Sequence, residues 1–170
     1  MSPAAAKVLV IGYGNPGRLD DGLGPGLADA LEKLRLPGVT VQVDYQLSVE
    51  DAVVVAEHDV VVFADASVTG PEPFFFDPVE PNGRLSFSSH SVAPPAVLAL
   101  AHELFDAGTE GYVLGIRGYR FDEFGESLSQ RAQANLAAAL QFLQALLLDG
   151  AFRSGRADPK WSSRGPKGSQ

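Results

Sequence analysis

Cysteine is absent from this chain of 170 residues, and none of its apolar stretches is long. Without cysteine, the protein can form no disulfide, no thiolate metal site and no thiol nucleophile. A segment that crosses a bilayer needs roughly 20 apolar residues. The N-terminal run VLVI is too short for that, and it is too short for a signal peptide. We therefore expect a cytoplasmic protein that does not interact with membranes.

Positive charge is scarce in most of the chain. The formal net charge is −8, yet five of the 13 Lys and Arg residues fall within residues 151–170. The acidic remainder argues against nonspecific binding of nucleic acid, which requires a basic surface. The length and the apolar content of 45% are typical of one globular domain. We predict a single domain over residues 1–150, followed by a disordered basic tail at 151–170.

Local sequence patterns predict an alternation of strands and helices. Apolar or alternating runs predict strands at 7–12, 39–44, 59–64 and 111–116, and weaker patterns predict short ones at 73–76 and 84–87. Helices are predicted at 25–36, 48–56, 94–105 and 127–148, with N-caps at Ser48 and Ser127. These elements indicate an α/β fold, a three-layer αβα sandwich around a mostly parallel, twisted sheet of about five strands.

The segment GYGNPGRLDDGLG follows the first predicted strand and matches the dinucleotide pattern GxGxxG at Gly12, Gly14 and Gly17. That pattern places a helix N-terminus against a pyrophosphate. Here the glycines and proline at 22–26 disfavour a helix before residue 25, and Asp20 and Asp21 would repel phosphate. A nucleotide-binding Rossmann-like module that uses these three glycines therefore stays only an alternative.

Three polar side chains are expected in loops just past predicted strands: Asp21, Asp65 and His90. In an open α/β sheet, ligands bind at the carboxyl ends of the strands, where strand order reverses. Two carboxylates and one imidazole suit divalent Zn, Mn, Fe or Ni and leave coordination positions open. The alternative is that His90 only hydrogen-bonds within its loop, and the residues alone leave both possibilities open. We expect His58 to end a helix and His102 to face solvent.

The sequence VLVIGYGNPGRLDDGLG resembles the N-terminal signature of the hydrogenase maturation endopeptidases. FADAS and SSHSV are similar to two further motifs of that family, and the matches together span residues 7–148. The resemblance implies an endopeptidase that removes a C-terminal extension from the large-subunit precursor of a [NiFe] hydrogenase once nickel has been inserted. Carried over position by position, the residues that engage this nickel are Asp21, Asp65 and His90.

The resemblance also implies a role for the loop around the first ligand. Gly14, Asn15, Asp20 and Gly22 are expected to form a substrate loop in which Asn15 hydrogen-bonds the loop to itself. Asp20 either orients the ligand loop or is only a solvated side chain, and both alternatives stay open. The glycines at 14, 17, 22 and 24 are expected to permit close approach to the substrate and positive φ angles. Nickel would be presented by the precursor, and zinc or cadmium could take its place in a crystal.

Catalysis is assigned to Asp21 and Asp65, either of which could activate a water as general base while the metal polarises the scissile carbonyl. An aspartic-type mechanism and a metal-assisted one both stay open. The first ligand is often Glu in the family, whereas Asp21 is shorter, and the loop at 117–126 also differs from the family pattern. We expect a monomeric, cytoplasmic enzyme. A chaperone-like partner of the hydrogenase that hydrolyses nothing is the remaining alternative.

Overall fold

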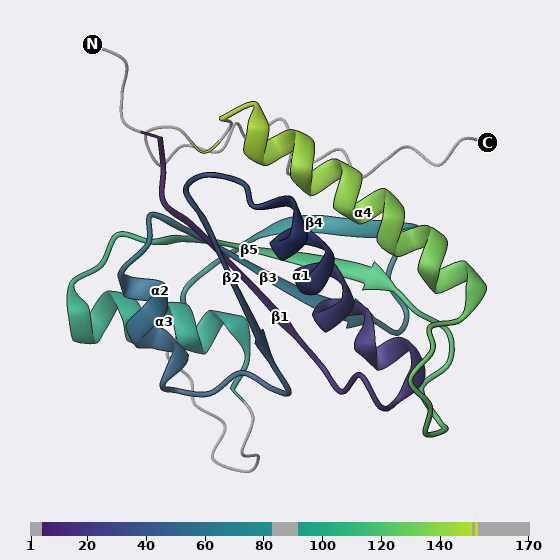
Figure 1. The fold of residues 1–170 in the computed structure, drawn as a ribbon. Helices are drawn as coiled ribbons and strands as arrows, with labels where there is room; N and C mark the ends of the chain where they lie inside the picture. Colours follow the sequence, from purple (N-terminus) through teal and green to yellow (C-terminus); the bar gives the residue numbers. More distant parts are fainter. Residues whose placement is uncertain (1–4, 83–91, 151, 153–170) are drawn as a thin grey trace.

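A five-stranded sheet forms the centre of the molecule (Figure 1). The computed structural model describes residues 5–82, 92–150 and 152. The strand order is β2-β1-β3-β5-β4, in which only β4 runs antiparallel to its neighbour. The strands are β1 Val8–Tyr13, β2 Val39–Asp44, β3 Val60–Ser67, β4 Phe74–Val79 and β5 Glu110–Arg117.

Helices cover both faces of this sheet. α1 and α4 pack on one face and α2 and α3 on the other (Figure 1). The helices are α1 Leu23–Leu34, α2 Asp51–Ala56, α3 Pro94–Phe105 and α4 Gln130–Leu148, with a 3-10 turn, η1, at Leu19–Gly22. The predicted three-layer αβα sandwich with a mostly parallel sheet is therefore confirmed. No helix within the described ranges is both long and apolar enough to cross a membrane.

The central strands are continuous apolar runs because both of their faces are buried. Along β1, Val8 and Val10 belong to the core cluster shared with α1 and α4, whereas Leu9 and Ile11 belong to the one shared with α2 and α3. This alternation follows from the two-residue period of a strand. A strand buried on both sides has no polar face, which is why KVLVIG could be recognised from the sequence.

Two glycines allow α1 to lie directly on the sheet. A Cβ atom on Gly12 would lie 2.2 Å from the carbonyl oxygen of Gly24, and one on Gly24 would lie 2.4 Å from the carbonyl oxygen of Tyr13 and 2.6 Å from that of Ala64. The first turn of α1 therefore contacts the main chain of β1 and of β3. Of the glycines at 14, 17, 22 and 24, only the first has a positive φ, so that expectation is wrong for the other three.

Several predicted boundaries are wrong. α1 begins at Leu23, not at residue 25, and η1 precedes it. Pro25 is accommodated because the first N–H groups of a helix have no partner within it. β3 continues to Ser67, because β5 runs alongside it as far as Arg117. Asp65 therefore lies inside a strand, not in the loop after it.

The predicted helix caps also differ from the observed ones. Ser129, not Ser127, caps α4, since its side chain accepts a hydrogen bond from the N–H of Ala132. At α2 the N-cap is Glu50 rather than the predicted Ser48.

The ranges 39–44 and 94–105 are confirmed as predicted, and the short strand predicted at 73–76 is β4. The strand predicted at 84–87 lies outside the described residues. So does nearly all of the predicted tail at 151–170. Its one described residue, Phe152, is buried against Tyr112, with 5.4 Å between ring centroids.

Candidate functional site

Two carboxylates meet where strand order reverses. The chain leaves β1 for β2 on one side and later returns as β3 on the other, so the carboxyl ends of β1 and β3 flank the reversal. Asp21 lies in η1, directly after the loop that leaves β1, and Asp65 lies near the end of β3. Ligands of open α/β sheets bind in the crevice at this position. The two residues are close enough for the charge of Asp21 to raise the pKa of Asp65.

Asp65 is a half-buried carboxyl with an unusual affinity for protons. Burial and the charge of Asp21 raise its pKa from 3.8 to about 6, against the opposing hydrogen bonds from the N–H of Ala66 and the Tyr13 hydroxyl. The Ala66 N–H donates to Oδ1 of Asp65 at 2.7 Å. Burial and the adjacent Asp65 in turn raise the pKa of Tyr13, which keeps its hydroxyl protonated. A carboxyl that titrates near neutral pH is suited to general acid or base chemistry.

Asp21 is held by the loop that precedes it. The N–H of Asn15 donates to Oδ2 of Asp21 at 2.9 Å, and Oδ1 of Asn15 accepts from the N–H of Gly17 at 2.9 Å. The expectation that Asn15 bonds the loop to itself is confirmed. Gly14 has φ +142°, and a Cβ there would lie 2.1 Å from the carbonyl oxygen of Asp21. Gly22 is buried in η1, where a Cβ would lie 3.1 Å from Cα of Pro16.

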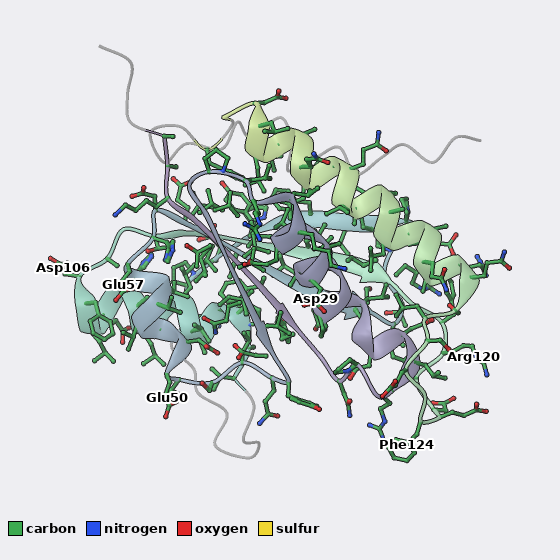
Figure 2. All side chains as sticks on the ribbon, in the orientation of Figure 1. Asp29, Glu50, Glu57, Asp106, Arg120 and Phe124 are labelled. Atoms are coloured by element: carbon green, nitrogen blue, oxygen red, sulfur yellow. The ribbon has the colours of Figure 1, made fainter. Side chains whose placement is uncertain are left out.

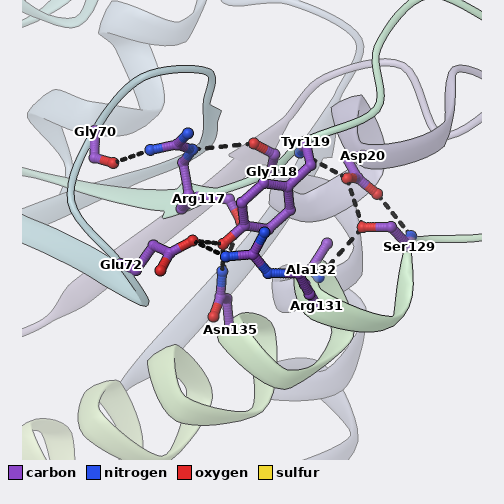
Figure 3. Close-up of polar contacts among 10 residues, drawn as sticks. All are labelled: Asp20, Gly70, Glu72, Arg117, Gly118, Tyr119, Ser129, Arg131, Ala132 and Asn135. Carbon is purple, nitrogen blue, oxygen red and sulfur yellow. Dashed lines mark hydrogen bonds and ion pairs between the residues drawn. The ribbon is translucent and has the colours of Figure 1, made fainter. Parts of the chain in front are cut away.

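Asp20 is fully buried, and its carboxylate faces Ser129 and the main chain at Tyr119 (Figure 3). Oδ2 accepts the N–H of Tyr119 at 2.8 Å, the N–H of Arg120 at 3.0 Å and the hydroxyl of Ser129 at 2.7 Å. Oδ1 accepts the N–H of Ser129 at 2.7 Å. Burial alone would raise the pKa of Asp20, but these donors outweigh it and hold the pKa below its ordinary value.

The loop after β5 therefore forms one unit with the loop that carries Asp21. Besides the contacts to Asp20, the N–H of Leu19 donates to the carbonyl of Gly125 at 2.9 Å, and the N–H of Gly125 donates to the carbonyl of Gly17 at 2.8 Å. Sequence reasoning missed this connection, because its partners lie about a hundred residues apart. The sequence offered one hint that Asp20 has a structural role, namely its position directly before Asp21, a predicted metal ligand.

A second acidic pair lies at the end of β2, beside β1. Nε2 of Gln42 donates to Oδ2 of Asp44 at 2.6 Å and to Oδ1 of Asp51 at 2.7 Å. The N–H of Ser48 donates to the other oxygen of Asp51 at 2.8 Å. Burial and the charge of Asp51 raise the pKa of Asp44, although Gln42 opposes the shift. The pairing of Asp44 with Asp51 was not predicted, because Gln42, which links them, looks like an ordinary strand residue.

His90 lies outside the described residues, so its predicted place beside Asp21 and Asp65 stays a prediction. Within the described part of the chain, no group of three or more His, Cys, Asp and Glu side chains is placed to hold a metal ion. His58 follows the C-cap of α2 and lies 2.7 Å from the carbonyl of Val54, as expected for a residue at a helix end. His102 is half-buried and lies 2.7 Å from the carbonyl of Thr109, so the expectation that it faces solvent is wrong.

The strand order defines a doubly wound α/β protein, a class whose ligands bind at a reversal such as the one between β1 and β3, where Asp21 and Asp65 lie. No protein-family model matches the sequence. No curated protein matches it either. Solved structures, by contrast, do match over most of the chain.

Three of these solved structures are maturation peptidases of hydrogenases. The protease HycI from Thermococcus kodakarensis KOD1 has a TM-score of 0.67 and 22% identity, over 85% of this chain and 95% of that one. The hydrogenase 2 maturation peptidase from Thaumarchaeota archaeon SCGC_AB-539-E09 has a TM-score of 0.61 and 22% identity, over 83% and 97%. The endopeptidase HybD from E. coli has a TM-score of 0.60 and 21% identity, over 85% and 94%. The chain therefore has the fold of the hydrogenase maturation proteases, as the sequence resemblance predicted.

Proposed function

We propose that this protein is an endopeptidase that removes the C-terminal extension of a nickel-loaded [NiFe] hydrogenase large-subunit precursor. The observation that carries the proposal is the pairing of Asp21 with Asp65 at the β1/β3 reversal, in a fold shared with proteases of that kind. The three motifs quoted above support it, because two of them contain Asp21 and Asp65 and the third contains His90, the remaining residue of the predicted set.

The metal in this proposal is part of the substrate. Asp21 and Asp65 would offer carboxylate oxygens and His90 an imidazole nitrogen, a mixed set that suits borderline divalent ions such as nickel. Three such ligands leave coordination positions open, which the thiolates of a loaded precursor would fill. Only a precursor that already carries nickel would then be held in position for cleavage. Zinc or cadmium could replace the ion in a crystal.

The proton affinity of Asp65 fits this role. In the free protein its carboxyl has a pKa of about 6 and is partly protonated near neutral pH. A divalent cation at short distance favours the charged form of a carboxyl. The arrival of a loaded precursor would therefore deprotonate Asp65. Either Asp65 or Asp21 would then take a proton from the water that attacks the scissile carbonyl.

The nucleotide-binding alternative has less support. Gly12 lies against the main chain of α1 at Gly24, and the N–H of Gly17 is bonded to the side chain of Asn15. Asp20 and Asp21 occupy η1, between β1 and the start of α1, where a pyrophosphate would have to lie. We infer a monomer that acts in the cytoplasm, on a protein substrate.

The decisive experiment compares nickel-loaded and nickel-free precursor from the same organism, incubated with the full chain. The wild-type protein should shorten only the loaded form. Asp65→Asn and His90→Ala should each lower the rate by at least about a hundredfold, because each removes a group required at the substrate metal. The matched control is Asp29→Asn, a change to an exposed carboxylate on α1 that should keep the wild-type rate (Figure 2).

Each other outcome has a defined meaning. Equal cleavage of both precursors would refute recognition through nickel. Tight binding of the loaded precursor without cleavage would indicate the chaperone-like partner. Tight NAD binding without cleavage would favour the nucleotide-binding module.

A further inference from the structure

The loop at 118–126, called here the arm, holds the most exposed large apolar side chain among the described residues. Phe124 is 84% exposed, and Figure 2 shows it at an outer end of the molecule. An exposed phenyl ring gains about 2–3 kcal/mol when it is buried. A single exposed apolar residue needs no explanation by itself. Phe124 differs because the loop beneath it is held at both ends.

The two ends of the arm are fixed by close packing against η1. At one end, a Cβ on Gly118 would lie 2.9 Å from Cβ of Asp20 and 2.8 Å from the ring of Phe121. At the other end, a Cβ on Gly125 would lie 2.7 Å from Cδ2 of Leu19. Leu19 itself has φ +50°, a left-handed conformation that is rare for leucine. Each end of the arm is therefore in close contact with η1, the turn that carries Asp21.

A second set of contacts anchors the arm to β4 and α4 (Figure 3). The hydroxyl of Tyr119 donates to Glu72 just before β4 and accepts from Nδ2 of Asn135 on α4, the latter at 2.9 Å. The guanidinium of Arg131 lies 4.2 Å from the centroid of the Tyr119 ring and pairs with Glu72 at 2.6 Å. The conformation of the arm is therefore set before any partner binds.

The tip of the arm combines the phenyl ring with a cation. Cζ of Arg18 lies 5.7 Å from the ring centroid of Phe124. Arg18 is exposed and has no ion-pair partner within the part of the chain that the structure describes. It stands three residues before Asp21, in the same loop. The tip therefore belongs to the same loop system as Asp21, so a protein whose terminal segment binds at Asp21 has this exposed pair nearby.

We propose that Phe124 and Arg18 form a docking contact for the folded body of the precursor, separate from the contacts that its C-terminal segment makes at Asp21 and Asp65. The precursor would present an apolar pocket for the ring, with a carboxylate or carbonyl oxygen at its rim for the guanidinium. This inference rests on the proposed function. Aromatic and Arg side chains are the commonest hot spots of protein interfaces, and a preordered loop loses little entropy on binding. The arm would thus select the precursor, while the carboxylates act on its terminal segment.

The test is single-turnover cleavage of the nickel-loaded precursor with the full chain in excess, which separates half-saturation from the maximal rate. Phe124→Ala should raise the half-saturating concentration about tenfold to a hundredfold and leave the maximal rate unchanged. Phe124→Tyr should restore most of the affinity. The matched control is Phe105→Ala, because that ring is 48% exposed at the end of α3, before the amino end of β5, whereas the arm follows the carboxyl end of that strand. Thermal unfolding should show the same midpoint for all four proteins, since both rings are exposed.

The possible failures can be told apart. If the wild type cleaves and Phe124→Ala has an unchanged half-saturating concentration, the docking contact is refuted and the proposed function stands. A lower maximal rate with unchanged half-saturation, or an equal effect of Phe105→Ala, refutes it as well. If the wild type does not cleave the loaded precursor, the proposed function fails and the docking proposal fails with it.

Discussion

At the scale of single residues, the pKa values of two aspartates are shifted in opposite directions. Asp20 lies in η1 and Asp65 lies near the end of β3. Asp20 is fully buried, yet four hydrogen bonds from Tyr119, Arg120 and Ser129 keep its pKa low. Asp65 is less buried, but it has fewer donors and a second carboxylate beside it, and its pKa rises to about 6. The number of donors, rather than the depth of burial, decides which carboxylate stays charged.

The raised pKa of Asp65 predicts that this side chain costs stability. Its pKa is 3.8 in the reference state and about 6 in the folded protein. Its contribution to the free energy of unfolding therefore falls as pH rises from 4 to 6 and stays low above that range. Asp65→Asn should stabilise the protein by about 1–3 kcal/mol near pH 8, and by clearly less near pH 4. Urea unfolding at both pH values measures this difference. An equal gain at both, or none, would contradict the assigned pKa.

At the scale of secondary-structure elements, the arm is ordered without being a helix or a strand. Its conformation depends on two glycines at its ends rather than on a repeating hydrogen-bond pattern. The same principle holds at the centre of the fold, where Gly12 and Gly24 let α1 touch β1. In both places the absence of a glycine side chain allows two segments to lie in close contact. These contacts position the loop that carries Asp21.

Gly118→Ala should damage the arm. The added methyl group would meet Phe121 at 2.8 Å, Asp20 at 2.9 Å and Leu23 at 3.1 Å. We expect a loss of about 1–3 kcal/mol in the free energy of unfolding, because a packed contact must be forced apart. Cleavage of the precursor should slow as well.

Gly108→Ala is the matched control for this change. No atom lies within 4 Å of a Cβ at Gly108, and its φ is not in the left-handed region. The substitution should leave stability unchanged or raise it by about 0.4–1 kcal/mol, by restricting the unfolded chain. If Gly118→Ala behaves like Gly108→Ala, the arm is not packed against η1 as described.

At the scale of the whole molecule, the sequence predicted the layers of the fold better than the connections between distant loops. Buried strands such as KVLVIG have a pattern that depends only on their own residues. The cap of α4 was misplaced because Ser127 and Ser129 are both suitable caps, and only Ser129 reaches Asp20. The end of β3 was misplaced because strand length depends on its neighbour β5. Asp21 and Asp65 could be paired from the sequence because the order of strands in a doubly wound sheet is restricted.

Asp20→Asn tests the connection between the loop that carries Asp21 and the loop after β5. An amide would turn N–H groups toward some of the four donors that now point at the carboxylate. We expect a loss of about 2–4 kcal/mol in stability near neutral pH. The loss should shrink as pH falls below 3.8, because the carboxylate of the unfolded wild-type chain then binds a proton before the folded one, whose pKa is lower. Urea titrations against Asp29→Asn provide the measurement, and equal stability of the two variants would show that Asp20 makes no net contribution.

The hydrogen bonds of Asp20 also determine when its loop can fold during synthesis of the chain. Their partners lie 99, 100 and 109 residues further along the chain. During synthesis, the loop that carries Asp21 leaves the ribosome early, but its buried anchor has no donors until the segment up to Ser129 has followed. In a nascent chain, β1, β2 and β3 can pair with one another while the loop that contains Asp20 and Asp21 still lacks these hydrogen-bond donors. The candidate site is therefore completed late, although Asp20 and Asp21 are among the first residues to be made.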